Sequence, residues 1–219
     1  MNFLNQLKSQ ASALQSQQTV ELQNFEASTH QTELACQTVW LYFGELAKQL
    51  NVITPAGPKL AIEPKKPWPE MKLTDFRVDA RKKKLRDKDV YDTIAMGWQI
   101  VPQVGEPLNC SVSVNFPPDL ERIEKRLAAG NVRHERINQR HPEKKTLQAI
   151  VFEFLTQARG SVNVTADHDN GQLVFRLANL NGFEVITTTW SATDIQGRQM
   201  DELAKMIVGQ PSRFVFAAL

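Results

Sequence analysis

The sequence predicts an α+β fold with antiparallel sheets, and three patterns support that class. Apolar residues recur every three or four positions through 33–50, as on the buried face of an amphipathic helix. Residues 108–116 alternate apolar and polar side chains, which is typical of a strand with one buried and one solvated face. Two short loops, 167–171 and 179–182, contain the Asn-Gly pair that favours tight hairpins.

The N-terminal residues 3–27 are expected to form a helical arm. Their apolar residues follow a heptad spacing that Gln18 interrupts: Leu4, Leu7, Ala11, Leu14, Leu22 and Phe25. One interpretation is a coiled-coil arm for homodimerisation or for a protein partner, and the other is a helix that folds back on its own domain. Two or three apolar heptads are too few to decide between them.

The helix at 33–50 follows the arm, either after a break at Ser28–Thr32 or as its direct continuation. The Thr54-Pro55 step ends it. The Pro-rich segment 59–69 comes next and is expected to cross the surface as an extended strap, with Trp68 as its anchor.

The middle of the chain predicts three strands that form an antiparallel meander, at 76–81, 94–100 and 108–116. A helix is then expected from Pro117 to Ala129, because proline suits the first turn of a helix.

Residues 132–141 could form either a short strand or a loop. A helix is expected from Pro142 to Ala158, because its apolar residues fall at helical spacing: Leu147, Ile150, Val151, Phe154, Leu155 and Ala158. A second meander at 161–166, 172–178 and 183–190 follows.

A last helix is expected at 198–208. The prediction is therefore two three-strand meanders, each flanked by helices, behind an N-terminal arm. In domain terms this gives an arm, 1–30, and a body, 31–219, in which two units, 33–130 and 143–216, share one core. The units have no residue-level similarity, so the pattern does not indicate a duplication.

Composition indicates a soluble globular protein and excludes a highly charged one. Of 219 residues, 42% are hydrophobic and 23% charged, and the net charge of +2 alone implies neither nucleic acid nor membrane. We find no signal peptide and no apolar run long enough to span a membrane. Cys36 and Cys110 are interpreted as free thiols, so a cytoplasmic location is expected.

The most conspicuous polar feature is a basic hairpin between the first two strands. From 59 to 88 there are 11 Lys and Arg against 5 Asp and Glu, and from 122 to 145 there are 8 against 3. Such zones could bind phosphates or an anionic surface, or could be a solvated turn that protects the sheet edge. The candidate anion-binding residues are Arg81, Lys82, Lys83, Lys84, Arg86 and Lys88.

Catalytic, cofactor and metal motifs are not apparent, so we predict no catalytic, cofactor-binding or metal-binding residue. His134 and His141 do not match a zinc spacing, and the Asp167-His168 loop is interpreted as a hairpin turn and not a calcium loop. An enzyme could still assemble its site from distant residues, with His134 and Glu135, or Asp167 and His168, as candidates.

Three functions follow in order of preference. The first is a non-catalytic protein-interaction module, resembling a chaperone or adaptor in role, that binds a partner or dimerises through its N-terminal helices. The second is a binder of nucleic acid or an anionic surface through the basic hairpin. The third is an enzyme.

Overall fold

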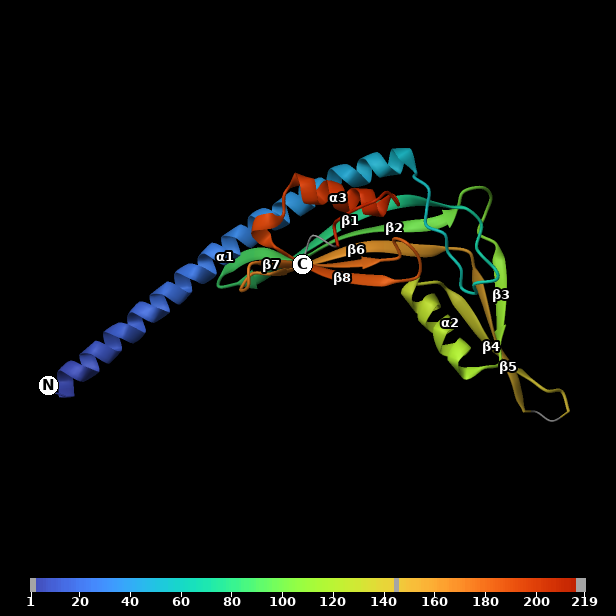
Figure 1. Ribbon diagram of the computed structural model, residues 1–219, viewed down its shortest axis with the longest axis horizontal. Coiled ribbons are helices and arrows are strands. Elements are labelled where there is room, and N and C mark those ends of the chain that lie inside the picture. The colour runs from blue at the N-terminus through green and yellow to red at the C-terminus, as the bar shows by residue number, and fades with distance from the viewer. Residues whose placement is uncertain (1–2, 144–145, 216–219) are drawn as a thin grey trace.

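The computed structural model describes residues 3–143 and 146–215, apart from the side chain of Leu4. In this part of the chain one very long helix, shorter helices and two antiparallel sheets make up the fold (Figure 1). The predicted α+β class with antiparallel sheets is therefore confirmed.

The longest element is α1, Phe3–Ile53, a single helix of 51 residues. At 1.5 Å per residue it is about 76 Å long. The arm and the helix at 33–50 are thus continuous, as one of the two interpretations expected. Its C-terminal half lies on the body, whereas its N-terminal half projects away from it (Figure 1). Among the described residues, no helix has both the length and the apolarity needed to cross a membrane.

The larger sheet has five strands in the order β1-β2-β6-β7-β8, all antiparallel. They are β1 Met71–Leu85, β2 Lys88–Pro102, β6 Ala158–Asp167, β7 Gln172–Ala178 and β8 Val185–Ser191. The last three form the predicted second meander, which is confirmed. The turns between them are the two loops that contain Asn-Gly.

One face of this sheet is covered by α1 and by α3, Gly197–Ile207, which lie on the same side of it (Figure 1). Between them and the sheet lies the main core. Val39 and Phe43 of α1 are fully buried there, together with Met96 and Ile100 of β2. The apolar stripe predicted for 33–50 is therefore a core stripe.

The smaller sheet has the order β3-β5-β4, with β3 Asn109–Val114, β4 His134–Arg140 and β5 Leu147–Leu155. Helix α2, Pro117–Ala129, begins at the predicted proline pair and is confirmed. The predicted strap at 59–69 is anchored by Trp68, which stacks on Phe154 of β5 with ring centroids 6.0 Å apart.

The helix predicted from Pro142 to Ala158 is wrong. Residues 144–145 lie outside the described part, but 147–155 are strand β5 and Ala158 begins β6. Residues 147–155 are almost continuously apolar. Such a run is compatible with the spacing of a helix and also with a buried strand, so its periodicity does not distinguish the two. Ile150, Phe152 and Phe154 alternate onto the core face, and β-branched and aromatic residues favour this outcome.

The first predicted meander also needs correction, because its three strands do not form one sheet. β1 and β2 form a long hairpin, but the free edge of β2 pairs with β6, and β3 pairs with β5 in the smaller sheet. The larger sheet therefore combines strands from both predicted units, 33–130 and 143–216. The division into an arm, 1–30, and a body, 31–219, stays a prediction.

Candidate interaction surfaces

The basic hairpin is the tip of β1 and β2. Its turn has only two residues, Arg86 and Asp87, both with positive φ (48° and 64°), which is the geometry of a type I′ hairpin turn. Residues other than glycine adopt this region at a cost, so other contacts must hold the turn. The guanidinium of Arg86 supplies them: it donates to Asp169 at 2.7 Å and lies 4.5 Å from the ring centroid of Phe25 in α1.

Two further residues of the predicted anion site also have partners inside the protein. The ammonium group of Lys82 lies 4.8 Å from the ring centroid of Tyr91. Lys83 forms an ion pair with Asp92 at 2.9 Å. The remaining three, Arg81, Lys84 and Lys88, are exposed and make no ion pair within residues 3–143 and 146–215. The structure therefore separates the six residues into three that stabilise the hairpin and three that face solvent.

A partly buried polar cluster fixes α1 to the sheet close to this hairpin. The Glu33 carboxylate accepts the backbone N–H of Tyr91 at 2.7 Å, and Ser28 Oγ donates to the carbonyl of His168 at 2.8 Å. His168 is 3% exposed, and its Nε2 lies 2.7 Å from the Tyr91 carbonyl oxygen. Sequence reasoning missed this cluster, because residues 28, 33, 91 and 168 carry no common motif.

The pairs considered for an enzyme are not assembled into a site. His134 and Glu135 are successive residues of β4, so their side chains point to opposite faces of the sheet. Asp167 accepts the Asn170 side-chain amide at 2.8 Å, which lowers the pKa of that carboxyl. His168 is turned toward Tyr91. Within the described ranges, no three His, Cys, Asp or Glu side chains gather as metal ligands would.

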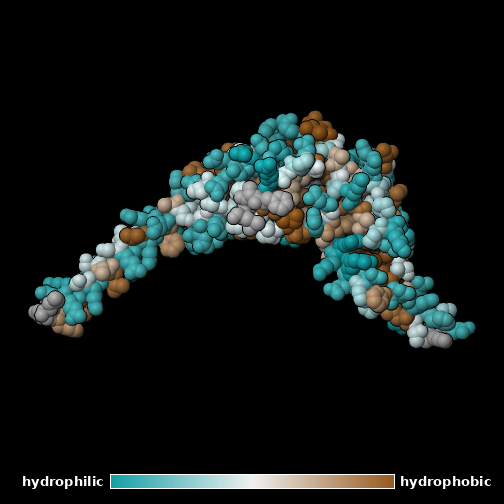
Figure 2. Space-filling model, in the orientation of Figure 1, coloured by the Kyte–Doolittle hydropathy of each residue, from teal (hydrophilic) through white to brown (hydrophobic). Residues whose placement is uncertain are grey.

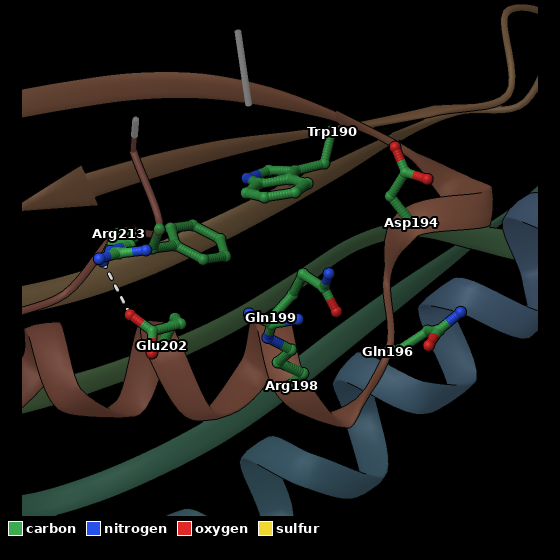
Figure 3. Close-up of a pocket in the computed structure, with 8 residues that line it drawn as sticks. Trp190, Asp194, Gln196, Arg198, Gln199, Glu202 and Arg213 are labelled. Atoms are coloured by element: carbon green, nitrogen blue, oxygen red, sulfur yellow. Dashed lines mark hydrogen bonds between the residues drawn. The ribbon is translucent and has the colours of Figure 1, made fainter. Parts of the chain in front are cut away.

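A half-open cavity of about 580 Å³ lies between α3 and the end of β8 (Figure 3). Its lining combines two aromatic rings with charged and amide side chains: Trp190, Asp194, Gln196, Arg198, Gln199, Glu202, Arg213 and Phe214. The Glu202 carboxylate is already hydrogen-bonded within the protein: it accepts from the Lys205 ammonium at 2.6 Å and from the Arg213 backbone N–H at 2.7 Å. The Lys205 hydrogen bond, above all, lowers the pKa of this carboxyl. No sequence pattern predicts this cavity.

The helical arm is the third surface, and it is the one with the most exposed apolar side chains. Leu7, Leu14 and Leu22 are 45%, 60% and 52% exposed. Because successive residues of a helix are rotated by about 100°, six positions share a sector about 80° wide. We call this the arm stripe: Leu7, Ala11, Leu14, Gln18, Leu22 and Phe25. In the arm, brown apolar residues interrupt a mainly hydrophilic surface (Figure 2).

Comparisons with known proteins add no assignment to these surfaces. No protein-family model, curated protein or solved structure matches this chain.

Proposed function

We propose that this chain is a non-catalytic interaction protein that joins a second copy of itself through the arm stripe. The supporting observation is that residues 5–27 of α1 are exposed, including the leucines of the stripe. A helix of this length without tertiary contacts is marginal in water, and most helices are stabilised by covering one apolar face. A second helix packed on the stripe supplies that cover.

The magnitude is sufficient for association. Complete burial of one leucine side chain is worth about 1.5–3 kcal/mol. Leu7, Leu14 and Leu22 from each of two arms therefore provide a driving force that can exceed the entropic cost of joining two chains. The polar Gln18 in the middle of the stripe lowers the stability of the contact. In return, a polar residue at such a position favours one register of the two helices over others.

Sedimentation velocity of the full chain tests the proposal. We expect the native protein to form dimers at micromolar concentration, and the triple variant Leu7→Gln, Leu14→Gln, Leu22→Gln to be monomeric. The variant should retain the thermal unfolding transition of the body, because these side chains are exposed and do not belong to its hydrophobic core. A monomeric native protein up to hundreds of micromolar would overturn the proposal.

Val20→Gln is the matched control. Val20 is 54% exposed on the same arm, but it lies about 160° around the helix from the centre of the stripe. Its replacement should leave the dimer intact. Equal weakening by Val20→Gln and by a single stripe variant would mean that general hydrophobicity, and not the stripe, causes association.

A second candidate function is the binding of a polyanion by the solvent-facing cations of the hairpin. One observation favours it: Arg81 lies on the uncovered face of the larger sheet, and the β-ladder places Arg176 on that same face. The exposed Lys84 and Lys88 lie on the same two strands near the hairpin tip. Arginine suits phosphate recognition because its guanidinium is planar and donates two parallel hydrogen bonds.

Binding to duplex DNA, measured at 50 and 200 mM salt, tests this second function. We expect weak affinity that falls steeply with salt, and a further loss on replacing Lys84 and Lys88 by Glu. Asp79→Asn, which removes an acidic group from the same sheet face, should strengthen binding. Binding that is absent at 50 mM salt, or that is insensitive to these changes, would dispose of it.

A further inference from the structure

We infer that the two arms pair antiparallel, with Leu7 of one copy opposite Leu22 of the other, so that the first turn of each α1 lies beside the basic hairpin of its partner. This inference rests on the proposed function, since it concerns the orientation of the same contact. It comes from the position of the arm stripe relative to the core stripe of α1 and from the charged residues Lys8 and Glu26 that flank the arm stripe.

The arm stripe and the core stripe lie on one side of α1. With a rotation of about 100° per residue, Phe43 falls inside the sector of the arm stripe, and Val39 falls within about 20° of its edge. Both are fully buried against the sheet. One side of α1 is therefore exposed to solvent at Leu7 and Leu14 and is covered by the protein's own sheet in the C-terminal half of the helix.

The body begins to cover this side at Phe25. The Arg86 guanidinium lies 4.5 Å from the centroid of the Phe25 ring, and Ser28 bonds to the turn that contains His168. From this point on, the hairpin tip and then the sheet occupy the place where a partner helix would lie. A helix that packs on the arm stripe must therefore end opposite Phe25.

This geometry decides the orientation of a second copy. In a parallel pair the partner's α1 would have to continue past Phe25, into the hairpin and the sheet. In an antiparallel pair the partner's body lies at the opposite end of the arm, and only the first turn of its α1, from Phe3, meets Phe25. The antiparallel pair alone allows two copies to use the whole stripe.

An antiparallel pair of identical helices has two-fold symmetry, so each arm residue lies opposite a different residue of the partner arm, and one register brings two leucines of the stripe together. Around a centre between Leu14 and Gln15, Leu7 corresponds to Leu22 and Ala11 corresponds to Gln18. Lys8 and Glu26 also lie on the same flank of the stripe. In an antiparallel pair this flank of one helix lies beside the same flank of the other, so Lys8 of one copy faces toward Glu26 of its partner. Their axial offset of about 8 Å is within reach of two long side chains.

This register uses the full length of the arm and holds the two bodies apart at its two ends. The stripe from Leu7 to Phe25 is about 27 Å long, so both hairpin tips flank one short two-helix rod. The dimer therefore carries one body at each end of the rod.

Disulfide trapping tests the orientation in the full chain with Cys110 replaced by Ser; Cys36 is buried and stays. Ala11→Cys and Gln18→Cys are made in two chains of different tag mass. The inferred register predicts that a mixture of the two forms the mixed disulfide at least tenfold faster than either variant links to itself.

Each alternative result has its own meaning. Efficient self-linking of both single variants indicates a parallel pair and overturns the inference while the proposed function stands. A dimer in sedimentation that gives no mixed disulfide indicates another register and also overturns it. A chain that stays monomeric in sedimentation overturns both the inference and the proposed function.

Discussion

The guanidinium of Arg86 lies over the ring of Phe25 and at the same time donates to Asp169 at 2.7 Å. One side chain thus connects the tip of the β1–β2 hairpin, the β6–β7 turn and the point at which α1 leaves the body. This contact sets the boundary between the covered and the uncovered part of the longest helix.

Arg86→Ala should loosen this boundary. Both charges of the pair are partly exposed, so the loss in stability should be small, about 0.5–1 kcal/mol. The local effect should be larger: amide hydrogen exchange at residues 25–32 should accelerate while that of Val39 and Phe43 stays slow. Lys84→Ala, on the same hairpin but without a partner in the described chain, is the control. Equal effects of both changes would show that Arg86 does not hold the helix.

The fold was predictable where one periodicity excluded the others. The two Asn-Gly turns fixed the hairpins of β6, β7 and β8, and the stripe of Val39 and Phe43 identified a core helix. The failure at 147–158 has a physical reason: Ile150, Val151, Phe152 and Phe154 form a nearly continuous apolar run, which is compatible with either period. Residues 147–155 form a strand because β3 and β4 pair with them on both edges, and their own sequence does not distinguish a strand from a helix.

The candidate surfaces were predictable only in part. The arm's heptad leucines and the basic residues were visible as patterns, but their partners were not. Nothing local in the sequence connects Phe25 with Arg86, or Glu33 with the backbone of Tyr91, because these contacts depend on the tertiary packing of α1 across the hairpin. For the same reason the sequence could not show that Lys83, one of the candidate anion-binding residues, forms an ion pair with Asp92.

The core role of α1 can be measured directly. Phe43 is 0% exposed, so Phe43→Ala should lower the free energy of unfolding by about 3–5 kcal/mol. Leu41, two residues away on the same helix, is 62% exposed, and Leu41→Ala should change stability by less than about 0.5 kcal/mol. Urea unfolding monitored by tryptophan fluorescence separates the two. A loss below 1 kcal/mol for Phe43→Ala would contradict its place in the core.

The two thiols should differ in reactivity. Burial above all, and then the nearby Glu33 carboxylate, raises the pKa of Cys36 to about 12, whereas Cys110 is only half-buried. A maleimide at pH 8 should therefore label Cys110 first, and Cys36 only as fast as the protein unfolds, as mass spectrometry of the native chain would show. Rapid labelling of Cys36 at low protein concentration would contradict its burial.

The same shift has a consequence for stability. The folded state keeps Cys36 protonated while the unfolded thiol ionises near its ordinary pKa of about 9, so the contribution of this group is complete below pH 9 and is lost as the pH rises toward 12. Cys36→Ala should flatten that part of the stability profile between pH 9 and pH 11. An unchanged slope would mean that other groups dominate the alkaline loss.

Gly160 and Gly97 offer a paired test of packing in the larger sheet. Gly160 stands directly opposite Trp98 in the β2–β6 ladder, and a Cβ added to it would come within 2.3 Å of the indole ring. The indole cannot yield easily, because it stacks on Phe76 with ring centroids 5.4 Å apart. Gly160→Ala should therefore lower the free energy of unfolding by about 1–3 kcal/mol.

Gly97→Ala makes the same chemical change in the neighbouring strand without the clash. The nearest atom to its added Cβ is the Gly160 carbonyl oxygen at 3.8 Å, an ordinary contact. Because alanine restricts the unfolded chain more than glycine does, this variant should be neutral or more stable by up to about 1 kcal/mol. Thermal unfolding of both variants gives the sign of each change. If Gly160→Ala proves as harmless as Gly97→Ala, the indole of Trp98 does not cover Gly160 and the proposed packing of Phe76, Trp98 and Gly160 is wrong.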